Sequence, residues 1–197
     1  MSKMLHKRLT TFSLSLLLFL SCVFIATGQE TSSIEAGPED YRQFEDQTPK
    51  HLPIKIKVKK EIEDGFRDLK NEFWARDFVL EVTNTGNKPI YYLSLNLWTD
   101  VRMASGHLIV FGLSFGQIEF GSLSVKAQTG DISIKPGEIY EFKLHQGELR
   151  AWEFMNRKEN RPQPKKLRAR FGMMSFGDGT AYVGTDGKAL PRKLNAH

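Results

Sequence analysis

Apolar and polar residues alternate along much of the chain, which is the period of a β-strand with one buried face. The clearest case is the stretch 76–100, where two alternating runs flank the polar residues 84–89. Those residues tolerate positive φ and end in a proline, which cannot donate to a strand ladder. The stretch predicts two strands joined by a short turn, with a shared buried set: Phe78, Leu80, Val82, Leu93, Leu95 and Leu97.

The same alternation predicts further strands on both sides of this pair. Residues 53–60 alternate apolar side chains with lysines, and Lys135–Glu138 carries the Pro-Gly of a type II turn between two short strands. The predicted strands are 53–60, 106–125 with kinks at its glycines, 131–134, 139–144, 166–176 and 181–184, the last two joined by a tight turn at 177–180.

Helical spacing is rarer. Leu149, Trp152 and Met155 recur at three-residue steps, so residues 147–159 predict one amphipathic helix, which ends before Pro162. Residues 61–75 predict a loop with one helical turn. Many short strands and one crossover helix favour an all-β fold, an immunoglobulin-like antiparallel β-sandwich of seven or eight strands, with a flattened barrel as the alternative.

The first 28 residues have the pattern of a cleaved signal peptide. A basic start precedes the apolar run 12–26 and a small-x-small site at Ala26–Gly28. The run is shorter than the roughly 20 residues that span a bilayer. We therefore expect export to the periplasm or the medium, with an uncleaved membrane anchor as the main alternative and a lipid anchor on Cys22 as a weaker one.

Removal of this segment changes the composition. The segment 1–28 contains three of the 28 basic residues and none of the 23 acidic ones, so the mature chain is nearly neutral. Its net charge therefore does not indicate nucleic-acid binding. The single cysteine also leaves, which excludes a disulfide, a thiol nucleophile and a cysteine metal site from the mature chain. We predict a flexible acidic leader over 29–50, a domain over 51–190 and a polar tail over 191–197.

Three turn motifs carry a resemblance. Glu81–Ile90, Ile134–Glu138 and Phe176–Thr180, in this order, resemble a group of small, exported, uncharacterised bacterial proteins with an immunoglobulin-like sandwich. The likeness covers most of 51–190. It implies the fold and supplies no catalytic residues.

Candidate catalytic and metal chemistry is sparse. Residues 112–116 match G-x-S-x-G, but we expect residues 117–121 to continue as a strand, whereas a nucleophile elbow needs a sharp turn into a helix. A hydrolase using Ser114 is therefore the least favoured hypothesis. The histidines of the mature chain lack the spacing of ligands on one element, and no cofactor is predicted.

Two sets of residues are candidates for binding. Tyr92 and Trp98 have the parity opposite to the buried leucines, so they could form an exposed platform for sugars. A basic cluster could dock on anionic glycan or lipid. Alternatively, it is a solvated face or a partner for the acidic leader. Its candidate binding residues are Arg161, Lys165, Lys166, Arg168 and Arg170.

The leading hypothesis is an exported, non-catalytic module for binding or assembly in the bacterial envelope. A glycan-binding module that uses exposed aromatic residues is the alternative. The partner is expected to be an envelope protein or an anionic glycan or lipid surface, and not nucleic acid.

Overall fold

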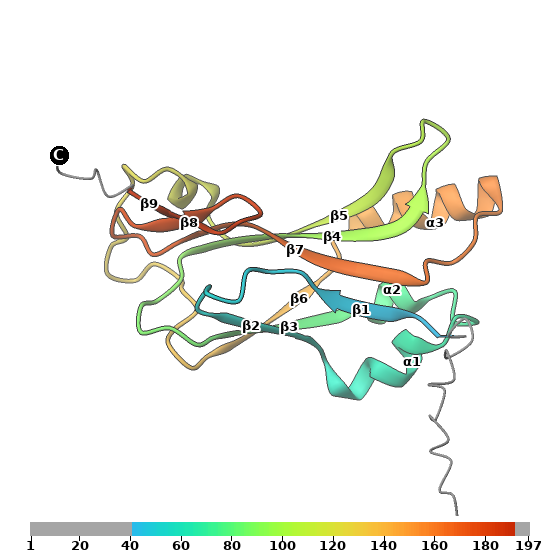
Figure 1. Cartoon of the computed structure of the whole chain (residues 1–197), viewed down its shortest axis with the longest axis horizontal. Helices are drawn as coiled ribbons and strands as arrows, with labels where there is room; N and C mark the ends of the chain where they lie inside the picture. The colour runs from blue at the N-terminus through green and yellow to red at the C-terminus, as the bar shows by residue number, and fades with distance from the viewer. Residues whose placement is uncertain (1–40, 192–197) are drawn as a thin grey trace, which may run out of the picture. The chain divides into compact units, whose positions relative to one another are not determined.

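The computed structural model describes residues 41–191, which form two β-sheets (Figure 1). Sheet 1 has the order β5-β4-β7-β8-β9, and β1 adds to β7 in parallel; sheet 2 has the order β2-β3-β6. The strands are β1 (Gln43–Asp46), β2 (Ile54–Val58), β3 (Val79–Asn84), β4 (Tyr92–Arg102), β5 (Leu108–Gly116), β6 (Ile139–Lys143), β7 (Lys166–Ser175), β8 (Ala181–Val183) and β9 (Lys188–Leu190).

Short helical segments join some of these strands. The longest is α3, which connects β6 of sheet 2 to β7 of sheet 1 and matches the predicted helix. The segments are η1 (Lys60–Ile62), α1 (Glu63–Arg67), α2 (Trp74–Asp77), η2 (Ile118–Gly121) and α3 (Gln146–Glu159). None of the helices within 41–191 is long and apolar enough to cross a membrane.

The mostly β, antiparallel architecture predicted from the alternation is confirmed, and the two sheets pack as a sandwich. Their inner faces share one core, in which the two predicted runs of alternating residues are buried. Members of that core with at most 1% exposure include Phe78, Leu80, Val82, Leu93, Leu95, Leu97 and Phe171.

The two strands of the stretch 76–100 do not pair with each other, although the sequence suggested a pair. β3 belongs to sheet 2, whereas β4 belongs to sheet 1. The connection 85–91 therefore passes from one layer to the other, and each strand pairs with other strands. The alternation could not show this, because it reports which face is buried and not which strand is adjacent.

The predicted leader is wrong at its C-terminal end. Residues 43–46 form β1, which pairs in parallel register with β7 from Gln43↔Lys166 to Asp46↔Ala169. Arg42 and Thr48, on either side of this strand, are buried. The packed part of the chain thus begins before His51. The predicted signal segment, the leader residues 29–40 and residues 192–197 of the predicted tail lie outside the described residues.

Other differences from the prediction are local. Residues 61–75 hold more helix than one turn, because Phe66 and Trp74 bury their rings from α1 and α2. The strand predicted to continue to residue 125 ends at Gly116 and gives way to η2. The strand predicted at 131–134 is reduced to one bridge, Ile134↔Ile90, and β9 was not foreseen.

Aromatic side chains close one side of the sandwich. Between β5 and β6, the rings of Phe115 and Tyr140 lie 4.6 Å apart, centroid to centroid. At the α3 end, Trp152 packs edge-on against Phe111 of β5 and Trp74 of α2. On the opposite side of the sandwich, a cavity lies between β1 and β2.

Candidate binding groove

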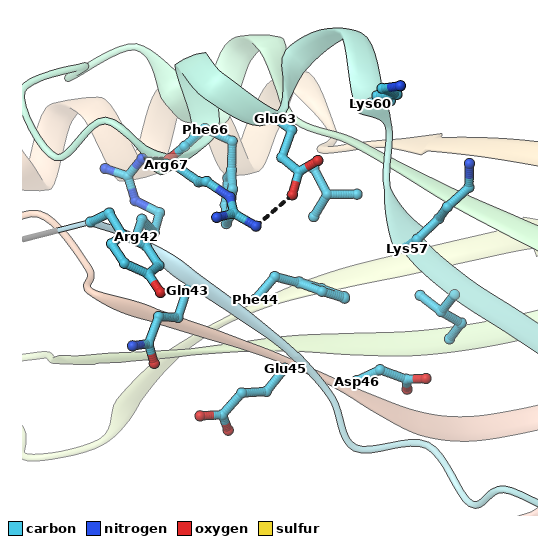
Figure 2. Close-up of a pocket in the computed structure, with 13 residues that line it drawn as sticks. Arg42, Gln43, Phe44, Glu45, Asp46, Lys57, Lys60, Glu63, Phe66 and Arg67 are labelled. Carbon is cyan, nitrogen blue, oxygen red and sulfur yellow. Dashed lines mark hydrogen bonds and ion pairs between the residues drawn. The ribbon is translucent and has the colours of Figure 1, made fainter. Parts of the chain in front are cut away.

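A cavity of about 720 Å³ lies between β1 and β2, with α1 alongside. We call it the edge groove. Figure 2 shows Phe44 pointing from β1 into this space. Its apolar lining is formed by Phe44, Ile56, Val58 and Phe66, and its polar lining by Tyr41, Arg42, Gln43, Glu45, Asp46, Lys57, Lys60, Glu63 and Arg67.

β1 directs half of its backbone groups toward the groove. The amide of Gln43 donates to the carbonyl of Lys165 at 2.8 Å, and the amide of Gln47 donates to that of Ala169 at 3.0 Å. Successive residues of a strand point their N–H and C=O groups to opposite edges. The backbone groups of Phe44 and Asp46 therefore face away from β7, on the groove side.

β2 has a free edge on the same side. Lys59 donates its amide to Val79 at 3.0 Å, and Pro53 accepts from the amide of Thr85 at 2.9 Å, so the odd-numbered residues bond to β3. Ile56 and Val58 consequently direct their backbone groups outward. Among residues 41–191, no strand pairs with this edge of β2 or with the second edge of β1. Exposed edges of this kind are templates for another extended chain.

Most of the charged side chains that line the groove already have partners. Arg67 pairs with Glu63 at 2.7 Å, as the dashed line in Figure 2 shows. Lys57 pairs with Glu81 on the outer face of sheet 2 at 2.7 Å. Lys60 forms no ion pair with any carboxylate of residues 41–191 and is exposed. The groove therefore offers one cation for an incoming carboxylate.

Arg42 fixes the start of β1 and is fully buried. Its Nε donates to the carbonyl of Pro164 at 3.0 Å and its Nη1 donates to that of Phe66. The guanidinium lies 4.7 Å from the ring centroid of Trp74. Burial lowers the pKa of Arg42 to about 10, against the opposing effect of Asp68 and Asp100, so the group stays charged at neutral pH.

The predicted basic residues do not form one free patch. On the outer face of β7, Lys166 and Arg168 pair with Glu45 at 3.5 and 3.0 Å. Arg170 donates to the side-chain oxygen of Gln47 at 3.0 Å. These contacts correspond to the alternative that the cluster serves as a partner for the acidic leader, because Glu45 and Gln47 lie in the segment predicted as leader.

The other two basic residues lie off this face. Arg161 pairs with Glu159 after the end of α3, and only 8% of its side chain is exposed. Lys165 is exposed just before β7, where its backbone amide donates to Asp100 at 3.1 Å. Partial burial of Glu45 acts to raise its pKa. Hydrogen bonds and attraction from Arg168 and Lys166 outweigh this effect, so the pKa of Glu45 is lowered. Binding of an anionic surface by the whole cluster stays a prediction.

Tyr92 and Trp98 share a sheet face but not a site. They stand six residues apart on β4, roughly 20 Å at the rise of a strand. Tyr92 lies beside Gly121 of η2, whereas the guanidinium of Arg170 lies 4.8 Å from the ring centroid of Trp98. The two rings therefore do not form one platform, and the predicted glycan contact at each of them stays untested.

The candidate nucleophile lies within a strand. Ser114 is exposed on β5, opposite Ser94 of β4, and β5 continues to Gly116. η2 begins four residues after Ser114, so the serine itself is not at the junction of strand and helix. Within residues 41–191, no group of three acidic, histidine or cysteine side chains is placed to hold a metal ion.

Comparisons of the chain with protein-family models, with curated proteins and with solved structures find no match. The resemblance to exported bacterial proteins thus stays a prediction. The edge groove itself was missed by sequence reasoning, since the leader was expected to be flexible. The one available signal was Phe44, an isolated apolar residue in an acidic segment.

Proposed function

We propose that this protein is an exported, non-catalytic binding module that takes up an extended segment of an envelope protein in the edge groove. The observation that carries the proposal is that β1 and β2 each have an edge with no strand partner within residues 41–191, and that both strands line one cavity. Main-chain hydrogen bonds to such an edge supply affinity, and side-chain pockets supply selectivity.

The chemistry of the groove defines the segment. Phe44 and Ile56 favour an apolar side chain at the centre. Lys60 favours an acidic residue toward the α1 end. A segment of this kind needs no catalytic group, and the proposed role is holding a partner and not transforming it.

We also infer that the sandwich is immunoglobulin-like. The strand orders β2-β3-β6 in sheet 2 and β5-β4-β7-β8 in sheet 1 support this inference. The consecutive strands β3 and β4 lie in different sheets, and the later strands β6 and β7 return beside β3 and β4, as in Greek-key sandwiches. Export rests on the pattern of residues 1–28. Secretion of the chain with a new N-terminus at Gln29 would support it, and retention of the intact N-terminus in the membrane would support the anchor.

Selection of a peptide ligand tests the binding role. Random ten-residue peptides displayed on phage are selected against the folded protein, and an enriched peptide is titrated while amide resonances are recorded. We expect the amides of Phe44, Asp46, Ile56 and Val58 to shift and to become protected from exchange, because they gain strand partners. Failure to enrich any peptide, or shifts confined to another face, would overturn the proposal.

A matched pair of charge reversals locates the contact. Lys60→Glu should weaken the selected peptide about three- to tenfold, since an exposed ion pair contributes roughly 0.2–1 kcal/mol and the reversal adds repulsion. Lys55→Glu makes the same charge change on the outer face of β2 and should leave the affinity unchanged. Equal losses in both variants would show attraction by net charge alone.

A further inference from the structure

The helix α3 turns one side toward solvent, and that side is basic. Its opposite side buries Leu149 and Trp152 in the core. At 3.6 residues per turn, the exposed residues of α3 other than Glu159 fall on one continuous arc that faces away from these two side chains. We call this arc the α3 outer face; its residues are Gln146, Gly147, Arg150, Ala151, Phe154, Arg157 and Lys158.

The acidic residues of α3 lie off the outer face, and each of them already has a partner. They are Glu148, Glu153 and Glu159, and their partners are the backbone amide of Gly112 in β5, the guanidinium of Arg76 and the guanidinium of Arg161, in that order. The outer face therefore has three cations and no anion.

The three cations have no carboxylate partner. Arg150 and Arg157 each donate to a backbone carbonyl of their own helix at 3.4 Å. Neither they nor Lys158 form an ion pair with any carboxylate of residues 41–191. Like charges gathered on one helix face repel one another, so a negatively charged surface would stabilise this arrangement.

An aromatic ring lies among these cations. Phe154 is 60% exposed, and the Lys158 ammonium lies 5.9 Å from its ring centroid. Arg150 is one turn before Phe154 on the helix, and Arg157 is one turn after it. At a membrane surface, a ring in this position enters the boundary between headgroups and acyl chains, while long basic side chains keep their charges at the headgroups. A polyanionic glycan would use the cations and leave the ring without a role, so a bilayer is the better match.

We propose that the α3 outer face docks this protein on the surface of an anionic lipid bilayer, with the Phe154 ring at the headgroup boundary and the three cations on lipid phosphates. Only one ring is available to the lipid, because the apolar side of α3 is buried in the core, so the contact is weak and reversible. The surface differs from the basic cluster predicted from the sequence, since it includes none of the five residues named there.

This docking surface is independent of the edge groove. No residue of α3 lines that groove, so the peptide role and the lipid contact can each fail without the other. The described residues belong to a compact unit that begins at Pro38. The assay therefore uses the chain from Gln29 onward, which keeps this unit and omits the apolar run 12–26 that would enter lipid by itself.

Co-sedimentation with vesicles measures the contact. One set of vesicles is phosphatidylcholine alone, and the other is an equal mixture of phosphatidylcholine and phosphatidylglycerol. We expect binding to the anionic set only, with a loss of affinity as salt is added, because salt screens exposed charges. Equal binding to both sets, or binding to neither, would overturn the proposal.

A matched pair of aromatic substitutions tests the ring. Phe154→Ala should lower the affinity for anionic vesicles about tenfold, because it removes the apolar contact with the lipid. Phe73→Ala is the control: Phe73 is 56% exposed but lies outside α3, so its loss should leave vesicle binding unchanged. If Phe154→Ala kept full affinity while a sulfated glycan also bound the protein, the outer face would be a polyanion site and not a membrane contact.

A matched pair of charge reversals tests the cations. Lys158→Glu should lower the affinity roughly tenfold or more, since each basic residue at an anionic membrane contributes about a factor of five and the reversal adds repulsion. Lys55→Glu makes the same change on the exposed outer face of β2 and should have an effect of less than about twofold, because its charge is screened over the distance to the lipid. Equal losses in the two variants would show that net charge, and not the α3 outer face, governs binding.

Discussion

Asn84 shows how one side chain joins the layers. It ends β3 and is fully buried, yet its amide is satisfied: Nδ2 donates to the carbonyls of Lys88 and Ile134 at 2.8 and 2.9 Å, and Oδ1 accepts from the amide of Gly86 at 3.0 Å. A buried amide is stable only when its groups are paired in this way. The Asn84 side chain therefore ties the start of the crossing from sheet 2 to sheet 1 to Lys88 and Ile134.

Asp178 performs a similar role at the turn after β7, but through charge. It accepts from Lys88 at 2.7 Å and from the amide of Thr180 at 2.9 Å. Partial burial raises the pKa of Asp178, and the hydrogen bonds from Lys88 and Thr180 outweigh it, so the pKa falls to about 2. The carboxylate remains ionised in moderately acidic solution.

A pH-dependent contribution to stability follows from this shift. The carboxylate form stabilises the folded state fully above the unfolded pKa of about 3.9, and the contribution is lost as the pH falls through the folded pKa of about 2. We expect Asp178→Asn to be less stable than the natural protein at neutral pH, with the difference vanishing between pH 4 and pH 2. Urea unfolding across this range measures it. A difference that persisted at pH 2 would show that shape, not charge, matters at this position.

At the scale of elements, β1 depends on more than its sequence. The strand is four residues long, with one apolar residue, and among the described strands it pairs with β7 alone. Two side chains hold the strand in place. Arg42 donates to the backbone carbonyls of Pro164 and Phe66, and Glu45 pairs with Arg168 of β7. The edge groove exists because these anchors hold β1 against the sandwich.

Arg42→Ala should therefore release β1. The change leaves buried carbonyls without a donor and empties the space beside Trp74, and each unpaired buried group costs about 1–3 kcal/mol. We expect the free energy of unfolding to fall by about 3 kcal/mol, and the amides of Gln43 and Gln47 to lose their protection in hydrogen exchange.

The control for this loss is Arg67→Ala. Arg67 is half-exposed, pairs with Glu63 on the same helix and lies 5.5 Å from the ring centroid of Tyr41, so its removal should cost at most about 1 kcal/mol. Similar exchange rates in the two variants would mean that β1 is held by its ladder and not by the buried guanidinium.

This dependence explains what the sequence could and could not predict. The strands β2, β4 and β7, the helix α3 and the type II turn at 135–138 follow from local periodicity and turn chemistry, and the carbonyl of Lys135 does accept from Glu138 at 3.0 Å. β1 could not be predicted, because its ladder partner β7 and the Pro164 carbonyl that receives Arg42 are more than a hundred positions away. The edge groove depends on the same placement of β1, so the isolated Phe44 could indicate a buried side chain but not a groove.

At the scale of the whole molecule, one core serves both sheets. Leu95 of β4 belongs to the same buried cluster as Leu80 of β3 in the other sheet, and its register partners are Leu113 and Phe171. The residues of 41–191 include no cysteine, so no disulfide within them joins the two sheets. A defect in either sheet should therefore lower the stability of both.

Leu95→Ala tests this coupling. Truncating a leucine that is 1% exposed removes apolar contacts and leaves a cavity, at a cost of about 2–5 kcal/mol. Because unfolding of a single core is cooperative, the loss should appear equally in hydrogen exchange at the slowest amides of β3 in sheet 2 and of β4 in sheet 1. Asn96→Ala, the exposed neighbour on the outer face, should change neither. Normal protection of β3 in the Leu95 variant would show that sheet 2 can stay folded while sheet 1 opens, in contradiction to one shared core.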